Sequence, residues 1–255
     1  MKNLLLIGHG VVGKAVHKGL SKNNVIDIVD KDQHEFTYAK AYDEWDGIIL
    51  CLPTPQGPQG ECDDFLVEQY IRVIRKKAPD VPILIKSTIS VELVDLLEGD
   101  TSLTFNPEFL TEADSTDEFQ NQSFVIFGGH QCRYWYEIFQ QSGIWMGSVK
   151  FTDMKTAAYA KYTINSFLAT KVIFFNELQS MFGEDGFDEL TQIVSMDDRI
   201  GKSHMMVPGP DRQYGFGGMC FPKDTSAFTT SGKGKLSLLQ KVIDINKELR
   251  NEIKK

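Results

Sequence analysis

The feature that most constrains the fold of this chain is a glycine pattern that directly follows its first apolar run. Residues 4–7 are LLLI, which suits a strand, residues 8–13 are GHGVVG, and residues 11–20 have the spacing of an amphipathic helix. In such a unit the first glycine allows a tight turn, the second lets the backbone approach a pyrophosphate, and the third lets helix and strand pack closely. The helix N-terminus then offers its N–H groups to the phosphates. The pattern therefore predicts a dinucleotide-binding unit.

The choice of dinucleotide depends on Asp30, which follows a second apolar run and stands 20 residues after Gly10. A carboxylate at this place accepts hydrogen bonds from the ribose hydroxyls of NAD and repels the 2′-phosphate of NADP. Lys31 beside it weakens that preference. We expect NAD as the cofactor; a structural glycine turn with a surface aspartate is the alternative.

Apolar runs alternate with amphipathic segments through the first 150 residues, which predicts βαβ units and a mostly parallel sheet. After that point the pattern becomes helical, with a Gly- and Pro-rich loop at 207–218. The fold class is therefore α/β: a Rossmann-type domain over residues 1–150, followed by an α-helical domain over residues 151–255, to which the motifs discussed below assign dimerisation and catalysis. The expected strands are 3–7, 25–29, 47–52, 82–86, 103–105 and 124–127, and the expected helices are 11–20, 65–77, 91–97, 152–182, 187–194 and 235–253.

Composition excludes several other classes of protein. The net charge of −8 argues against a nucleic-acid binder, which needs a basic surface. No stretch approaches the roughly 18 apolar residues that span a membrane. The four cysteines are widely spaced and lack the grouping of a zinc site, so we expect thiols, no metal and a cytoplasmic location.

Unusual residues concentrate at positions 215–224, which are GFGGMCFPKD. The glycines allow the backbone to wrap closely around a ligand. If Cys220 opens a helical turn, Asp224 shares its face, and the N–H groups of the helix start favour the thiolate. Cys220 is therefore a candidate nucleophile, although a lone cysteine is more often a buried apolar side chain.

Other candidate residues stand on the predicted long helix and after predicted strands. Lys161 and Asn165 are four residues apart on one helix face and could stabilise an oxyanion, or could be ordinary surface residues. Ligands of open α/β sheets bind outside the carboxyl ends of the strands, where Thr88, Glu108 and Glu112 would lie. Each of these could instead belong to a capped loop.

In this order, the motifs resemble the UDP-glucose/GDP-mannose dehydrogenase family. The resemblance runs through GHGVVG, CLPTPQG, KSTIS, NPEFLTEA, KYTINSFLATKVIFFNEL, DDRIG and GFGGMCFPKD, and covers most of the chain. It implies oxidation of the C6 hydroxymethyl group of a nucleotide sugar to a carboxylate with two NAD⁺ in sequence, in polysaccharide precursor synthesis.

The resemblance also implies a role for each matching residue. Cys220 would form a thiohemiacetal and then a thioester, Lys161 and Asn165 would stabilise the oxyanion, and Asp224 would assist with water or proton handling. Thr88, Glu108 and Glu112 would organise water and proton transfer. The cofactor would contact Gly8, Gly10, Val11, Val12, Gly13, Asp30, Thr54 and Thr88. The substrate would contact Phe109, Leu110, Tyr214, Gly215, Phe216 and Gly217, together with Arg199, which family members present to the neighbouring subunit.

Two departures from the family pattern keep other functions open. The segment from Asp30 to Gly47 is short, and Lys255 ends the sequence where relatives continue into a second α/β domain that binds the nucleotide. A compact enzyme, a nucleotide-binding subunit supplied separately, and a chain that kept only cofactor binding all fit. A two-electron alcohol or hydroxyacid dehydrogenase and a non-catalytic NAD-binding module are the alternative functions. A homodimer through residues 152–182 is expected, because their apolar positions exceed one helix face.

Overall fold

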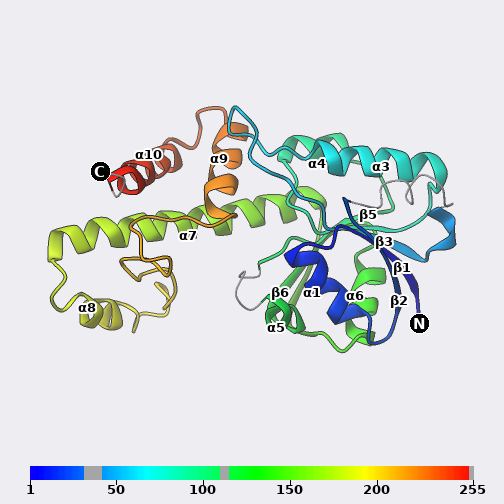
Figure 1. Ribbon diagram of the computed structural model, residues 1–255, viewed down its shortest axis with the longest axis horizontal. Coiled ribbons are helices and arrows are strands. Elements are labelled where there is room, and N and C mark those ends of the chain that lie inside the picture. The colour runs from blue at the N-terminus through cyan, green and yellow to red at the C-terminus, as the bar shows by residue number, and fades with distance from the viewer. Residues whose placement is uncertain (32–41, 110–114, 253–255) are drawn as a thin grey trace. The chain divides into compact units, whose positions relative to one another are not determined.

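The computed structural model describes residues 1–31, 42–109 and 115–252. Contacts divide the chain into two units, Met1–Pro55 with Asp63–Lys161 and Gln56–Cys62 with Tyr162–Lys255. The first unit holds a seven-stranded sheet, and the second is helical (Figure 1). The predicted α/β class, with a Rossmann-type sheet followed by a helical region, is confirmed. The boundary that we placed at residue 150 stays a prediction.

The sheet has the strand order β2-β1-β3-β4-β5-β6-β7. Neighbouring strands are parallel except β5 and β6, which pair antiparallel. The chain leaves β1 for β2 on one side and then crosses to β3 on the other, so a topological switch point lies at the carboxyl end of β1. The strands are β1 (Asn3–Ile7), β2 (Val25–Val29), β3 (Gly47–Leu50), β4 (Ile83–Ile85), β5 (Leu103–Phe105), β6 (Asn121–Gly129) and β7 (Trp145–Thr152).

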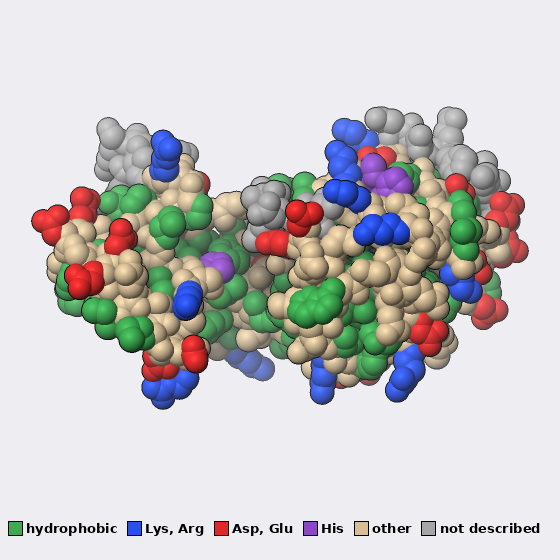
Figure 2. Space-filling view, turned by 90° about the horizontal axis from the view of Figure 1, so that it is seen from below, with side chains coloured by type: hydrophobic (Ala, Val, Ile, Leu, Met, Phe, Trp, Pro, Cys, Tyr) green, Lys and Arg blue, Asp and Glu red, His purple; other side chains and the backbone are tan. Residues whose placement is uncertain are grey.

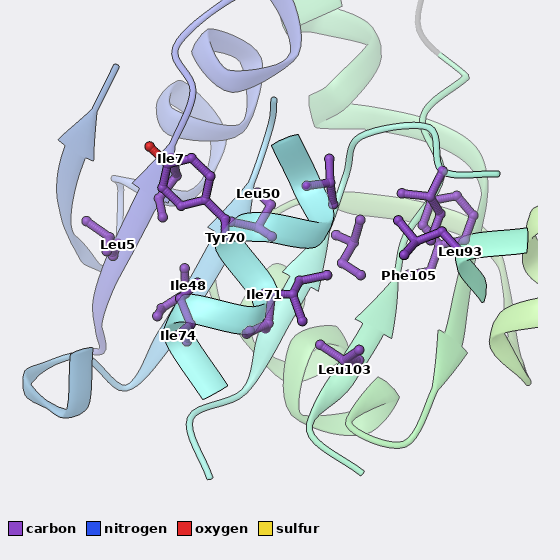
Figure 3. Close-up of a cluster of buried hydrophobic side chains, with 14 of the residues drawn as sticks. Leu5, Ile7, Ile48, Leu50, Tyr70, Ile71, Ile74, Leu93, Leu103 and Phe105 are labelled. Carbon is purple, nitrogen blue, oxygen red and sulfur yellow. The ribbon is translucent and has the colours of Figure 1, made fainter. Parts of the chain in front are cut away.

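Helices cover both faces of this sheet (Figure 1). One face carries α3 (Phe65–Lys77) and α4 (Val91–Leu96), and the other carries α1 (Val11–Leu20), α5 (Ser115–Gln120) and α6 (Cys132–Gln141). Because side chains of a strand alternate between faces, Leu5 and Ile7 pack under α3 while Leu4 and Leu6 pack under α1 and α6. Figure 3 shows the first cluster, where Tyr70, Ile71 and Ile74 of α3 meet Ile48 and Leu50 of β3. A short 3₁₀ helix, η2 (Tyr42–Glu44), precedes β3.

Three elements of this unit, α5, α6 and β7, were not expected from the sequence. Strand β7 has no apolar run and owes its place to backbone pairing with β6 at the sheet edge. Helix α6 is rich in aromatic residues that favour strands. It is helical because Cys132, Trp135, Ile138 and Phe139 recur on one buried face.

Helix α7 (Met154–Phe182) begins in the first unit and continues from Tyr162 in the second, which also holds α8 (Phe187–Val194), α9 (Phe221–Ser231) and α10 (Ser237–Glu252). The predicted start of the long helix at Thr152 was wrong, because Thr152 ends β7 and Asp153 caps the helix by accepting a 2.7 Å bond from the Thr156 N–H. Ala169 and Ile173 of α7 pack with Val242 of α10 in a small core. None of the helices described is long and apolar enough to cross a membrane.

The packing of α5 yields a stability test. Phe119 is fully buried against Phe139, and its ring lies so close to Gly19 that a Cβ there would come within 2.5 Å. We expect Phe119→Ala to lower the free energy of unfolding by about 3–5 kcal/mol in urea denaturation, because a large cavity is left. The matched control, Phe65→Ala, removes a ring that is 64% exposed and should change the same quantity by under about 0.5 kcal/mol. Equal effects would contradict the packing described.

Candidate functional site

The glycine turn after β1 brings two backbone segments into close contact. Gly8 has φ +93°, and a Cβ on it would lie 2.3 Å from the Cys51 carbonyl oxygen. A Cβ on Gly13 would lie 2.1 Å from the Gly8 oxygen, so α1 approaches the turn as closely as backbones allow. Gly10 differs, because a Cβ there would meet nothing within 4 Å. This open space at the start of α1 fits a pyrophosphate.

The remaining predicted cofactor residues lie around this turn or at the carboxyl ends of neighbouring strands. Val11 is exposed at the start of α1, and Val12 is half-buried. Asp30 directly follows β2 and is exposed, with one oxygen accepting a 2.8 Å bond from the Lys31 N–H. Thr54 is buried beyond β3. The arrangement suits a dinucleotide whose ribose reaches Asp30.

His9, inside the glycine motif, received no role from the sequence. Its Nε2 lies 3.3 Å from Nδ1 of His17 on α1. Burial lowers the pKa of His9, and the neighbouring His17 and Lys14 lower it further, while Asp30 acts in the opposite direction. His9 is therefore held neutral at physiological pH and adds no charge to the glycine turn.

Polar side chains gather where β4 and β5 end. The Asn106 N–H continues the ladder by donating to the Ile85 oxygen at 2.9 Å, and the Ser87 hydroxyl accepts from the Leu52 N–H at 2.7 Å. These bonds fix the segments that carry Thr88 and Glu108 at neighbouring positions of the sheet edge. The carboxyl edge of the sheet is where the sequence placed them.

A buried lysine that the sequence analysis missed holds this group together. The Lys86 side chain is fully buried, with Nζ 2.8 Å from Glu108 Oε2 and donating to Asn106 Oδ1 at 2.8 Å. Asn106 in turn donates to the Ile126 oxygen at 2.7 Å. A buried cation is tolerated only when it is paired and hydrogen-bonded. The signal in the sequence was a lysine that directly follows a fully apolar strand, ILI at 83–85.

Lys161 reaches the same segment from α7. It is buried, its Nζ donates to the Glu108 carbonyl oxygen, and it lies 5.0 Å above the Phe109 ring. The Phe109 N–H donates to Glu108 Oε1 at 2.8 Å. The two other residues predicted here, Leu110 and Glu112, lie outside the described residues.

The cysteines differ sharply in exposure. Burial raises the pKa of Cys51 to about 12, with Glu108 adding to the rise and Lys86 opposing it, so its thiol stays neutral. Burial also raises the pKa of Cys132, whose Sγ donates to backbone oxygens. Cys62 is buried, whereas Cys220 is exposed. Exposure therefore favours Cys220 as the thiol that a substrate can reach.

Cys220 stands at the N-cap of α9, where its carbonyl accepts the first helical bond from the Asp224 N–H at 2.8 Å. Pro222 occupies the first turn, a place that suits it because no N–H is needed there. The start of α9 thus places the Cys220 side chain beside the positive dipole end of a helix.

Asp224, one turn further, is almost completely buried between two partners. The Lys223 Nζ lies 2.5 Å from Oδ1, and the Asn165 amide donates to Oδ2 at 2.6 Å. Lys223 was not singled out from the sequence. The contacts fix the orientation of the Asp224 side chain, and they occupy the Asn165 amide. The role of Asn165 as an oxyanion donor stays a prediction.

Two asparagines and an arginine hold the glycine loop that precedes Cys220. The Gly215 N–H donates to Asn176 Oδ1 at 2.8 Å, and Asn246 bonds both the N–H and the carbonyl of Phe216, at 2.7 and 3.0 Å. Arg250 donates to the Gly215 oxygen at 3.1 Å. The sequence analysis did not identify Asn176, Asn246 or Arg250. Asn246 could have been noticed because it is a polar residue on the apolar face of a helix.

The remaining predicted substrate residues lie on loops of the second unit. Tyr214 and Gly217 are half-buried. Arg199 follows α8, pairs with Asp197 at 2.6 Å and has a side chain that is 89% exposed. This exposure leaves the Arg199 side chain accessible to a ligand.

The glycine turn gives a test with an internal control. We expect Gly13→Ala to unfold or strongly destabilise the first unit, because its Cβ would overlap the Gly8 oxygen. Gly10→Ala should change the free energy of unfolding by under about 1 kcal/mol, yet weaken NAD⁺ binding in calorimetry at least about tenfold, because the methyl group enters the pyrophosphate space. Unchanged NAD⁺ affinity in a folded Gly10→Ala protein would argue against this placement of the cofactor.

The grip of Asn246 gives a second test. Asn246→Ala leaves two buried backbone groups of Phe216 without partners, and we expect a loss of about 2–4 kcal/mol of unfolding free energy. Asn246→Asp keeps the acceptor and should lose less. The free energies of unfolding are measured by thermal denaturation. Lys247→Ala, on the exposed side of the same helix, is the control and should leave this free energy nearly unchanged. A neutral Asn246→Ala would show that the loop is held otherwise.

Two family models match the chain. The NAD binding domain of the UDP-glucose/GDP-mannose dehydrogenase family matches residues 16–140, and the central domain of that family matches residues 155–248. The match of the NAD binding domain confirms NAD as the cofactor.

Similar proteins agree with these matches. The UDP-glucose 6-dehydrogenase of Rickettsia prowazekii (strain Madrid E) is 30% identical over 242 residues, which cover 86% of this chain and 54% of the relative. A UDP-glucose 6-dehydrogenase of Bacillus subtilis (strain 168) is 30% identical over 231 residues, which cover 83% of this chain and 51% of the relative. The chain thus spans about half the length of these curated relatives.

Solved structures share the fold. A UDP-glucose dehydrogenase of the hyperthermophilic archaeon Pyrobaculum islandicum has a TM-score of 0.79 at 22% identity, covering 97% of this chain and 68% of that one. The 3-hydroxyisobutyrate dehydrogenase of Mycobacterium tuberculosis has a TM-score of 0.71 at 18% identity, covering 97% and 93%. With both family models matched along most of its length, the chain belongs to the UDP-glucose/GDP-mannose dehydrogenase family.

Proposed function

We propose that this chain is an NAD-dependent nucleotide-sugar dehydrogenase that oxidises a C6 alcohol to a carboxylate through a thioester on Cys220. The observation that carries the proposal is the exposed Cys220 at the start of α9, one turn before a buried carboxylate that Lys223 and Asn165 hold in place. In a family of dehydrogenases, such a thiol supports a second oxidation that a simple alcohol dehydrogenase lacks.

The chemistry balances in four steps. The alcohol loses a proton from oxygen and a hydride from carbon, which gives an aldehyde. The Cys220 thiolate adds to the aldehyde carbon, and the resulting thiohemiacetal loses a second proton and hydride to become a thioester. Water then attacks the thioester, releases the carboxylate and returns the thiolate. NAD, when bound, accepts one hydride at each oxidation.

The residues of the first unit supply proton handling and cofactor binding in this proposal. Glu108, paired with Lys86, accepts protons at the sheet edge, with Thr88 and Glu112 organising water. Lys161 places a buried ammonium beside the same segment and stabilises the developing oxyanion. The glycine turn, Asp30 and Thr54 hold NAD.

The residues of the second unit supply covalent catalysis and substrate contacts. Asn165 assists at the oxyanion, and Asp224 directs the hydrolytic water or takes its proton. The loop at 214–218 wraps the sugar. The backbone of this loop is fixed by Asn246 and Asn176, so the loop is preorganised for a ligand.

A homodimer through α7 belongs to the same proposal. Phe167, Phe174 and Met181 recur every seven residues on this helix and are 67%, 59% and 80% exposed. Figure 2 shows one face of the protein, on which hydrophobic side chains lie exposed between charged ones. An apolar stripe of this length on a helix is typical of a protein contact. Arg199 would then act at the partner's substrate, and we place the enzyme in the cytoplasm.

A two-electron dehydrogenase is the second candidate. The fold is shared over nearly the whole length of the 3-hydroxyisobutyrate dehydrogenase structure, so the fold by itself is compatible with a single oxidation. In that case Cys220 would be a bystander.

The two candidates separate in one assay. The protein is incubated with NAD⁺ and one of UDP-glucose, GDP-mannose or UDP-N-acetylmannosamine, and the NADH formed is measured by its absorbance. We expect two NADH per molecule of sugar oxidised. Cys220→Ser should stall because its hydroxyl is a far weaker nucleophile than a thiolate. The control, Cys132→Ser, replaces a buried thiol that donates to backbone oxygens and should keep the stoichiometry.

Two outcomes would contradict the proposal. One NADH per sugar with unchanged activity of Cys220→Ser would identify a two-electron enzyme. No NADH from any of the three sugars, with NAD⁺ still bound, would remove the proposed activity.

A further inference from the structure

We propose that a polar cleft in the second unit binds an elongated small molecule that carries phosphate, with Lys233 and Lys247 as its cationic contacts. The cleft lies between helices α9 and α10 and a hairpin formed by residues Gln56–Cys62, all of which belong to this unit. Among the described residues that line it, none is proposed above to bind NAD or the sugar. Binding in this cleft therefore goes beyond the proposed function.

Contacts between the hairpin and α9 form one wall of the cleft. The Gln56 side chain donates to Ser226 Oγ at 3.1 Å, and a Cβ on Gly60 would come within 2.5 Å of the same oxygen. The hairpin is closed by a 2.8 Å bond from the Gly57 N–H to the Glu61 oxygen, and it lies beside α9 in Figure 1. This wall is held in place by the protein itself, which lowers the entropy cost of binding a ligand.

The size of the cleft indicates the size of the ligand. Its volume is about 650 Å³, which suits a molecule such as a nucleotide or a sugar phosphate. Four residues spaced three or four apart on one face of α10 line it: Ser237, Gln240, Ile243 and Lys247. From Ser237 to Lys247 the helix rises about 15 Å. An elongated ligand fills such a cleft better than a single inorganic phosphate.

Lys233 and Lys247 give the cleft a positive charge in a chain whose net charge is −8. Among the described residues, neither lysine forms an ion pair, and no aspartate or glutamate lines the cleft. Lys233 has φ +47°, a left-handed conformation that glycine adopts more readily. Cations without an internal partner can bind an anionic ligand, and lysine commonly binds phosphate in proteins.

The groups around the two lysines suit the same ligand. Ser237 is the first residue of α10, so the N–H groups of the first helical turn and the positive end of the helix dipole lie at the cleft. The carbonyl groups at the end of α9 accept N–H groups of the turn that follows. Glu61 accepts from the Gln59 N–H at 2.8 Å, and Asp244 accepts from Gln240 at 3.0 Å, so both carboxylates already have partners.

Chemical labelling of lysines locates the ligand. The protein is saturated with NAD⁺, so that the cofactor site is filled, and is acetylated with and without UMP, glucose 6-phosphate or inorganic phosphate. The modified lysines are then quantified by mass spectrometry. We expect UMP or glucose 6-phosphate, near saturation, to slow the acetylation of both Lys233 and Lys247 at least about fivefold. Uridine and glucose, the matched neutral molecules, should have no effect.

Lys241 is the internal control for this labelling, because it is exposed on α10 and does not line the cleft. Its rate of acetylation should be the same in every sample. If neither UMP nor glucose 6-phosphate protects both Lys233 and Lys247, the proposal is overturned, whatever inorganic phosphate does.

Two single variants each remove one ammonium group. Lys233→Gly introduces a residue that tolerates the left-handed backbone, and Lys247→Ala removes an exposed side chain, so both proteins should fold. We expect the affinity for the protecting molecule, measured by calorimetry with NAD⁺ present, to fall at least about tenfold in each variant, because a charged contact to phosphate is lost. Lys241→Ala changes the net charge equally and should keep the affinity. Unchanged affinity in either cleft variant would overturn the proposal.

The affinity for NAD⁺ distinguishes this cleft from the cofactor site. Weakened phosphate binding with unchanged NAD⁺ affinity would support the cleft. An equal loss of NAD⁺ affinity in Lys233→Gly and Lys247→Ala would overturn it, because the variants would then act on the whole protein. If the unsubstituted protein yields no NADH with any sugar, the proposed function fails, while the labelling and calorimetry still decide whether the cleft binds phosphate.

Discussion

The closest backbone contacts at the carboxyl edge of the sheet join the glycine turn after β1, the segment after β3 and the start of α1. A side chain on Gly8 would meet the Cys51 carbonyl, and one on Gly13 would meet the Gly8 carbonyl, so these backbone segments leave no room for a Cβ atom between them. This contact aims the start of α1 at the switch point between β1 and β3. The same edge carries the ends of β4 and β5, and therefore Thr88 and Glu108.

Each unit carries a carboxylate with little exposure to solvent, and the two are arranged in a similar way. Glu108 pairs with Lys86, which bonds Asn106, and Asp224 pairs with Lys223 and accepts from Asn165. In both cases a lysine supplies charge and an asparagine fixes direction. Such pairs add little to stability, because desolvation offsets their attraction. What the pairs do provide is a fixed orientation for each carboxylate.

Local pattern predicted much of this molecule, and long-range contacts account for the rest. Strands β1 and β2 and helix α8 were found with their observed bounds, because apolar periodicity and turn residues mark them. Strand β7 was missed because its pairing with β6 is a backbone interaction that leaves no apolar run. Lys86 and Asn246 escaped attention since their partners lie 20 and 30 residues away, and no local pattern records such contacts. By contrast, Cys220 and the glycine turn were identified from the sequence because both stand in recognisable local motifs.

The central claim is that Cys220 carries the substrate as a thioester. The most direct measurement is a single turnover with NAD⁺ and nucleotide sugar, quenched in acid, digested and analysed by mass spectrometry of the peptide that contains Cys220. The account predicts a uronyl adduct on this peptide that requires NAD⁺, appears before free uronate and then decays. Uronate formation with Cys220 unmodified at every time point would contradict it.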